Sequence, residues 1–388
     1  AVGFSVAGAG DVNGDGFADV LVGAQTYDNG EAQEGAAFVF LGSPSGIADG
    51  NPVTAHAQLE SNQPGAFLGA TVAGAGDVNG DGFADVLVGA GLYDAGQADE
   101  GAAFVFLGSP SGIADGNPVT AHAQLESNQT TAQMGVSVAG AGDVNGDGFA
   151  DVIVGANLYD FLQSDEGAAF VFLGSANGIA DGNPLIAYAR LYSHQANARG
   201  GASVAGAGDV NGDGFADVIV GANGYSGGQA NEGVAFVYVG GAIGIRFGDP
   251  TTAQARLESN QTGALMGRSV AGAGDVNGDG FADVIVGAHL YDAGQADEGA
   301  AFVFLGSATG IPDAIPASAH AQLESNQAGA AMGYSVAGAG DVNGDGFSDV
   351  LVGAVGYDGG ETNEGATFVF LGSASGIASG NPATAHAQ

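Results

Sequence analysis

The chain has 388 residues, of which 43 are Asp or Glu, five are Lys or Arg and six are His, so its formal net charge at pH 7 is −38. A charge of this size and sign repels nucleic acid and anionic membrane surfaces and attracts cations. The absence of cysteine excludes disulfide and thiol chemistry. The apolar runs are much shorter than the roughly 20 residues of a membrane-spanning helix, so we expect neither a nucleic-acid partner nor membrane insertion.

One segment recurs along the whole chain. The string "AGAGDVNGDGFADVLVGA" at residues 7–24 returns, with small changes, at residues 73, 139, 205, 271 and 337, in steps of 66 residues. A fixed period of this length is typical of a repeat architecture. We therefore expect one domain, residues 1–388, built from six repeats with the approximate bounds 1–66, 67–132, 133–198, 199–264, 265–330 and 331–388.

The sequence pattern of each repeat predicts four short β-strands, and the first repeat shows the pattern. "FSVAGAG" (4–10) is rich in Gly and Ala, as expected where strands crowd around an axis, and "ADVLVGA" (18–24) is an apolar run typical of a strand buried on both faces. "GAAFVFLG" (35–42) carries two large phenylalanine side chains. "AHAQLES" (55–61) alternates between apolar and polar residues, which suits an exposed outer strand. No segment shows a capped helical period, so helix is expected only as single turns.

Four antiparallel strands repeated at a constant interval are typical of a β-propeller. One such sheet cannot bury both of its faces, whereas six sheets stacked face to face can. The expected fold is all-β, a six-bladed β-propeller of four-stranded antiparallel blades. The alternatives are an open array and a parallel β-helix, although the coils of a β-helix would be much shorter than 66 residues.

The loop between the first and second strands contains a cluster of oxygen-bearing side chains that could bind a metal ion. In the first repeat it reads "DVNGDGFAD", residues 11–19, with side-chain oxygens at loop positions 1, 3, 5 and 9 and glycine at positions 4 and 6. Several hard oxygen ligands, with glycines that let the backbone curl around the ion, are what Ca²⁺ requires. The carbonyl at position 7 completes the shell, and its phenyl ring is free to enter the core.

We expect about six structural Ca²⁺ ions, one in each loop. The predicted ligands are loop positions 1, 3, 5, 7 and 9 of each repeat: Asp11, Asn13, Asp15, Phe17, Asp19, Asp77, Asn79, Asp81, Phe83, Asp85, Asp143, Asn145, Asp147, Phe149, Asp151, Asp209, Asn211, Asp213, Phe215, Asp217, Asp275, Asn277, Asp279, Phe281, Asp283, Asp341, Asn343, Asp345, Phe347 and Asp349.

These loops have two alternative interpretations. A turn rich in Asp, Asn and Gly forms for its backbone preferences alone, with no metal. Three carboxylates within nine residues nevertheless repel one another unless a cation lies between them. Mg²⁺ is disfavoured because it retains its waters and seldom uses a cage made only of protein ligands.

The sequence resembles the FG-GAP repeats of integrin α-subunit propellers, and more closely the bacterial integrin-like repeats. The shared features are the "SVAGAGDVNGDGFADVLVGA" core, the "EGAAFVFLGS" strand and the "SGI" turn, and they cover all six repeats. The resemblance implies a propeller with calcium in the loop between the first and second strands, on its lower face. The signature itself has drifted: Leu68-Gly69 and Met134-Gly135 stand at "FG" positions, and none of the six "GAP" positions keeps its proline.

Other residues suggest sites away from these loops. Tyr27 and Glu34 recur in every repeat, in links expected at the opposite end of the strands. They either form a hydrogen-bonding rim for a ligand, or Glu34 ties down its own loop and Tyr27 packs between blades. All five arginines lie between residues 190 and 268, which is either drift among the repeats or a patch for an anionic or glycan ligand. Four histidines at one equivalent position (56, 122, 320 and 386) are expected to be plain surface residues.

These features predict a calcium-stabilised binding or adhesion module, extracellular or on the cell surface, that recognises a protein or glycan. The alternative is a structural building block of a surface layer or filament, which binds copies of itself. An enzyme is disfavoured because no nucleophile–base pair stands out and the clustered carboxylates are assigned to metal. We therefore predict no catalytic residues and no organic cofactor.

Overall fold

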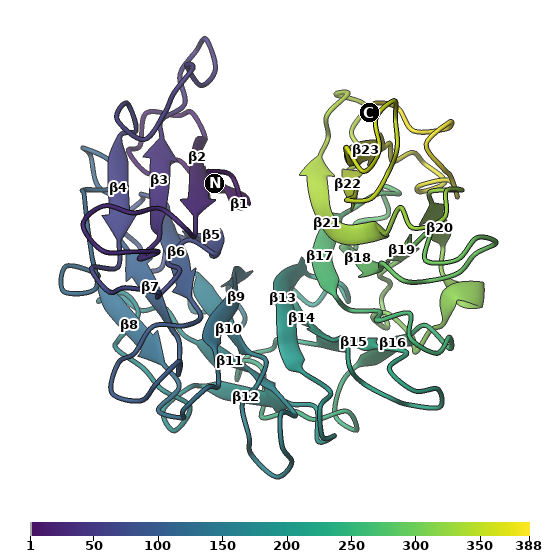
Figure 1. Ribbon diagram of the computed structural model, residues 1–388, viewed down its shortest axis with the longest axis horizontal. Helices are drawn as coiled ribbons and strands as arrows, with labels where there is room; N and C mark the ends of the chain where they lie inside the picture. Colours follow the sequence, from purple (N-terminus) through teal and green to yellow (C-terminus); the bar gives the residue numbers. More distant parts are fainter. Residues whose placement is uncertain (1) are drawn as a thin grey trace. The chain divides into compact units, whose positions relative to one another are not determined.

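The computed structural model describes residues 2–388 and is all-β apart from one 3₁₀ turn, η1 (Pro316–Ser318) (Figure 1). Contacts divide the chain into two compact units, one of residues 1–161 and 167–191 and the other of residues 162–166 and 192–388. Each unit contains three antiparallel sheets, which we call blades 1 to 3 and blades 4 to 6 in chain order.

The first unit contains three four-stranded blades. Blade 1 comprises β1 (Ser5–Gly10), β2 (Asp19–Ala24), β3 (Ala36–Phe40) and β4 (Ala57–Glu60); blade 2 comprises β5 (Thr71–Gly76), β6 (Asp85–Ala90), β7 (Ala102–Phe106) and β8 (Ala123–Glu126); blade 3 comprises β9 (Met134–Gly142), β10 (Asp151–Ala156), β11 (Ala168–Phe172) and β12 (Ala189–Tyr192).

The second unit repeats this arrangement. Blade 4 comprises β13 (Gly200–Gly208), β14 (Asp217–Ala222), β15 (Val234–Tyr238) and β16 (Ala255–Glu258); blade 5 comprises β17 (Ser269–Gly274), β18 (Asp283–Ala288), β19 (Ala300–Phe304) and β20 (Ala321–Glu324); blade 6 comprises β21 (Met332–Gly340), β22 (Asp349–Ala354) and β23 (Ala366–Phe370). The fourth strand position of blade 6 is a single antiparallel bridge between Val369 and Ala387.

The strands of each blade lie side by side in the order of the sequence. In blade 2, Ala73 of β5 faces Leu87 of β6, Leu87 faces Val105 of β7, and Val105 faces Ala123 of β8. The outer strand β8 alternates between buried and half-buried residues, as its sequence pattern predicts. The prediction of an all-β protein with six propeller blades is therefore confirmed, and every blade lies within one 66-residue repeat.

The hydrophobic core lies between neighbouring blades. One cluster in the first unit joins Leu21, Val39 and Leu59 of blade 1 to Val86 and Phe104 of blade 2. Burying an aromatic or aliphatic side chain of this size contributes about 1.5–3 kcal/mol, so the stacked sheets stabilise one another. Strands β6, β10, β14 and β18 are buried along their whole length, which explains their uninterrupted apolar sequence.

The first strands of neighbouring blades approach closely. A Cβ added to Gly74 would stand 2.7 Å from the carbonyl oxygen of Gly8, and one added to Gly140 would stand 2.8 Å from that of Gly74. The same spacing recurs in the second unit between Gly272 and Gly206. Only glycine fits at this position, which confirms within each unit that the Gly- and Ala-rich strands crowd together.

Candidate functional site

The carboxylate loops join the first and second strands of each blade, and blade 2 shows their geometry. The Asp77 carboxylate lies at the centre of the loop: Oδ1 accepts hydrogen bonds from the amides of Gly80 (2.6 Å) and Asp81 (3.1 Å), and Oδ2 accepts one from Gly82 (2.8 Å). Gly80 and Gly82 have φ angles of +73° and +90°, a region that side chains disfavour. The glycines therefore let the backbone wrap around one carboxylate.

Loop positions 3 and 5 join this arrangement. The Asn79 side-chain oxygen accepts from the Asp81 amide at 3.0 Å, and its NH₂ group donates to Oδ2 of Asp81 at 2.9 Å. The amide of Phe83 donates to the other Asp81 oxygen at 3.0 Å. The structure thus brings positions 1, 3 and 5 together on an exposed loop, and the contacts from position 1 recur in all six loops.

Loop position 9 has a role that the sequence did not reveal. Asp85 is completely buried; its Oδ2 accepts from the Val78 amide at 2.8 Å, and its Oδ1 accepts from the Gly108 amide at 2.8 Å. This carboxylate therefore fastens the start of the loop to the link between the third and fourth strands. The equivalent residue makes both contacts in every blade, as Asp19 does with Val12 and Gly42.

The electrostatics of the two kinds of carboxylate differ. The pKa of Asp85 is raised to about 6, chiefly by burial of its carboxylate. Hydrogen bonds from the amides of Gly108 and Val78 lower this pKa, whereas the negative charges of Asp81 and Asp77 raise it further. The same causes raise the pKa of Asp151 to about 7. At position 1 of blade 6, hydrogen bonds, first of all from Gly346, hold the pKa of Asp341 below its usual range. In blades 2 and 3 the loop therefore places a buried carboxylate near exposed carboxylates whose negative charges oppose its ionisation.

This donor set fits a cation. A positive ion beside opposed carboxylates favours their charged forms, and each carboxylate oxygen that accepts one hydrogen bond keeps a second lone pair for a metal. Three carboxylates, a side-chain amide oxygen and a backbone carbonyl are the ligands that Ca²⁺ prefers. Among residues 2–388, no three His, Cys, Asp or Glu side chains already converge as they would around a bound ion. The thirty ligands named from the sequence remain a prediction.

The phenyl ring at loop position 7 does not enter the core. Phe17 is 36% exposed, and Phe83 is half-buried with its ring against Gly14 in the loop of blade 1. In blades 1 and 2 the side chain that anchors the loop is instead the valine at position 2, since Val12 and Val78 are completely buried. The Ala84 amide also donates to the Asp11 carbonyl at 2.9 Å, so neighbouring loops are connected through both backbone and side chain.

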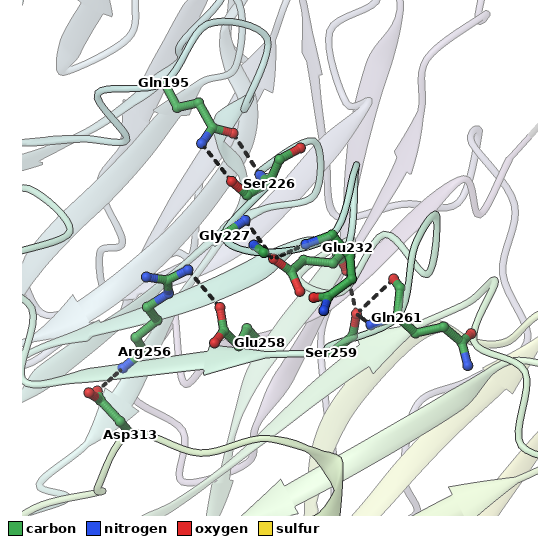
Figure 2. A network of polar contacts seen from close by, with 11 residues as sticks. Gln195, Ser226, Gly227, Glu232, Arg256, Glu258, Ser259, Gln261 and Asp313 are labelled. Atoms are coloured by element: carbon green, nitrogen blue, oxygen red, sulfur yellow. Dashed lines mark hydrogen bonds and ion pairs between the residues drawn. The ribbon is translucent and has the colours of Figure 1, made fainter.

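At the opposite end of the strands, Glu34 and Tyr27 have structural roles. Glu34 is completely buried, and its Oε1 accepts from the Asn29 amide at 2.5 Å. Tyr27 packs edge-on against Phe38, with ring centroids 5.2 Å apart. Figure 2 shows the equivalent network in blade 4, where Glu232 accepts from Gly227 at 2.5 Å and Ser259 donates to the Glu232 carbonyl at 2.7 Å. The interpretation that Glu34 ties down its own loop is confirmed. Tyr93, the equivalent of Tyr27 in blade 2, packs against the core cluster that blades 1 and 2 share, as expected for a tyrosine between blades.

Three of the five arginines have separate local partners. Arg190 donates to the Leu185 carbonyl at 2.6 Å. Arg256 forms a 2.6 Å ion pair with Glu258 (Figure 2). The Arg256 guanidinium also lies over the ring of Tyr225. Arg268 lies over the ring of Tyr334 and donates to its hydroxyl at 3.1 Å. The histidines at positions 56, 122, 320 and 386 are exposed, as predicted.

The family model of the FG-GAP repeat matches the chain six times, at residues 2–40, 68–106, 134–172, 200–238, 266–304 and 332–370. Each match runs from the first strand through the carboxylate loop to the end of the third strand. The chain belongs to the FG-GAP repeat family. The FG-GAP resemblance seen in the sequence is therefore confirmed, and the matched segments contain all thirty predicted ligands.

The FG-GAP repeats of this chain are similar to those of integrin α subunits. Integrin alpha-5 of Xenopus laevis is 34% identical over 159 residues, which cover 40% of this chain and 14% of the integrin. Integrin alpha-V of Gallus gallus is 30% identical over 231 residues, covering 58% of this chain and 20% of the integrin. Integrin alpha-IIb of Homo sapiens is 34% identical over 173 residues, which cover 43% of this chain and 16% of the integrin. The chain thus spans no more than a fifth of the length of these relatives. Among its described residues, no helix has the length and apolar character needed to cross a membrane.

Proposed function

We propose that this protein is a calcium-stabilised binding module that acts outside the cell or on its surface and recognises a protein or a glycan. The observation that carries the proposal is the carboxylate loop, which has the same donor set in all six blades. Membership of the FG-GAP family and similarity to integrin α subunits support a role in adhesion.

Calcium is proposed to act on stability through the contacts between loops. The Asp11 carbonyl accepts from Ala84, and the ring of Phe83 covers Gly14, so ordering one loop also orders its neighbour. A site with a dissociation constant of ~10⁻⁴ M, typical of extracellular modules, would add about 1.4 kcal/mol at roughly 1 mM free Ca²⁺. Six such sites would add on the order of 8 kcal/mol, comparable with the 5–15 kcal/mol by which a whole domain is usually stable.

The end of the strands opposite the loops is the proposed recognition surface. The residue that follows the glycine at the entrance to the first strand is Ala70, Val136, Arg268 or Tyr334 in different blades, although the flanking sequence is nearly constant. Tyr334 is 37% exposed at this position. Varied side chains on a constant scaffold are what selective binding needs, and Tyr and Arg are enriched at interfaces. In contrast, the repeated acidic residues Asp19 and Glu34 accept hydrogen bonds from backbone amides, which supports binding rather than catalysis.

The proposal is tested by screening the purified protein against cell-surface extracts and a glycan array, in 1 mM CaCl₂ and in EDTA. We expect selective capture in calcium that is lost in EDTA and weakened by Tyr334→Ala. The matched control is Val119→Ala, which changes a side chain that is 93% exposed on the link between β7 and β8 and should leave capture unchanged. Failure to bind any surface component, or capture that EDTA and Tyr334→Ala leave unaltered, contradicts the proposal.

A further inference from the structure

The link between β15 and β16 in blade 4 departs from the pattern of the repeats. Residues 241–247 read "GAIGIRF", whereas the equivalent residues 109–115 of blade 2 read "SPSGIAD" and residues 175–181 of blade 3 read "SANGIAD". Serine becomes glycine, a polar residue becomes isoleucine, alanine becomes arginine, and aspartate becomes phenylalanine. The change in chemical character is therefore concentrated in one short segment.

This segment lines a pocket of about 290 Å³ at the end of β15 (Figure 1 shows the strand). Tyr238 and Ile245 in its wall are 4% and 1% exposed. Ile243 and Phe247 also line it and are 58% and 60% exposed, and the side chain of Arg246 is exposed beside them. A pocket with apolar walls and one charged group has the general composition of a small-molecule site.

The equivalent pockets of blades 2 and 3 serve as internal comparisons. They have volumes of about 290 Å³ and 210 Å³ and are lined by Asp115 and Asp181 at the position of Phe247. In those blades the aspartate is structural, because Asp115 accepts from the Gln58 amide at 2.8 Å and Asp181 accepts from the Gln124 amide at 2.9 Å. Blade 4 has lost this carboxylate and gained a guanidinium and a phenyl ring in the same place.

The charge in the blade 4 pocket is not neutralised locally. No carboxylate lines the pocket, and the ion pairs His194–Asp249 and Arg256–Glu258 do not involve Arg246. Asp249, two residues beyond Phe247, accepts hydrogen bonds from the amide of Thr251 at 2.7 Å and its hydroxyl at 2.6 Å. In a chain of net charge −38, this pocket therefore presents a guanidinium beside apolar side chains.

We propose that the pocket binds a small organic monocarboxylate with an apolar body. The body packs against Ile243 and Phe247, and the carboxylate accepts charge-assisted hydrogen bonds from Arg246, whose planar fork matches carboxylate geometry. The equivalent pockets of blades 2 and 3 do not share this specificity, because they present a carboxylate of their own. The inference is independent of the proposed function, since it requires neither a partner at the opposite end of the strands nor occupied calcium loops.

The test is isothermal titration of the whole protein, in 1 mM CaCl₂, with hexanoate and with its neutral counterpart hexanamide. We expect hexanoate to bind at one site per chain and about tenfold more tightly than hexanamide, the effect of about 1.4 kcal/mol from one charge-assisted contact. Arg246→Ala restores the residue found in blades 1 to 3 and should weaken hexanoate binding by about the same factor, with hexanamide unchanged. Phe247→Asp should weaken both ligands.

The matched control is Arg268→Ala, which removes the same charge from a residue outside the pocket and should leave hexanoate binding unchanged. Thermal melts of each variant establish that it is folded. Three results overturn the proposal: no hexanoate binding up to about 20 mM, equal binding of acid and amide, or an equal loss in Arg246→Ala and Arg268→Ala.

Discussion

The phenyl ring of Phe83 lies against Gly14, in the carboxylate loop of the preceding blade: a Cβ on Gly14 would stand 2.7 Å from Cε1 of that ring. The same contact joins Phe149 to Gly80, Phe281 to Gly212 and Phe347 to Gly278. Each ring packs on the neighbouring loop rather than in its own blade. The carboxylate loops are therefore part of the packing between blades.

This contact predicts a difference between two glycines of one loop. Gly80 and Gly82 both have positive φ, but a Cβ would meet Phe149 at 2.7 Å only from Gly80, and open space from Gly82. Gly82→Ala should cost about 1 kcal/mol from backbone strain, and Gly80→Ala should cost about 1–3 kcal/mol more because it also displaces the ring. Urea unfolding of the two variants measures the difference, and equal losses would mean that the ring does not support the loop.

The buried aspartate at loop position 9 predicts a stability effect that needs no metal. Asp85→Ala leaves the amides of Val78 and Gly108 without their acceptor, so it should cost about 2–3 kcal/mol even in EDTA. The control is Asp81→Ala, whose exposed side chain bonds only within the loop and should cost less than about 1 kcal/mol under the same conditions. Similar losses for both variants would contradict a separate fastening role for Asp85.

The raised pKa values predict opposite pH trends with and without calcium. Burial and neighbouring carboxylates raise the pKa of Asp85 and Asp217 to about 6 and that of Asp151 and Asp283 to about 7, above the value of 3.8 for a free side chain. A folded-state pKa above the unfolded value contributes stability that is fully present below pH 3.8 and is lost as pH rises through 6 to 7. In EDTA, the protein should therefore melt at a higher temperature at pH 5 than at pH 8.

Calcium should reverse this trend, because the ion favours the ionised carboxylates and competes with protons for them. The increase in Tm on adding 1 mM CaCl₂ should be larger at pH 8 than at pH 5. The melts are repeated in about 0.5 M KCl, because salt at this concentration screens the repulsion between exposed charges. The pH dependence of Tm that remains in this buffer is due to the buried carboxylates. A calcium-induced shift that is independent of pH would contradict the assignment of these carboxylates to the metal site.

Calorimetric titration of the metal-free protein with CaCl₂ should give a stoichiometry near six, since the donor set is identical in every loop. The double variant Asp77→Ala, Asp81→Ala removes two of the predicted ligands from one loop and should lower the stoichiometry by one. A value near one or two for the unmodified protein would show that most loops are turns without metal.

Much of the fold could be predicted because the repeat fixes what each segment must do. The apolar run of β6 predicts a strand buried on both faces, and the alternation in β8 predicts a strand with one buried face. The burial of both strands in the structure confirms these predictions. The contact of the Phe83 ring with Gly14 could not be predicted, because the period of the repeat does not show which neighbouring blade a side chain packs against. The fastening role of Asp85 was hidden for a related reason: its partner Gly108 is 23 residues away and contributes only a backbone amide.

The pocket in blade 4 was missed although the sequence held a signal for it. The clustering of the five arginines between residues 190 and 268 points to Arg246, but not to its neighbours Ile243 and Phe247. A position-by-position comparison of residues 241–247 with the other repeats would have shown that a polar residue and an aspartate were both replaced by large apolar side chains.

The most direct test of the central claim, that calcium in the carboxylate loops stabilises the stacked blades, is scanning calorimetry of one preparation in 1 mM CaCl₂ and in EDTA. We predict a fall in Tm of more than about 10 °C when calcium is removed, because on the order of 8 kcal/mol of binding free energy is lost. Identical melting curves in the two buffers would contradict the claim.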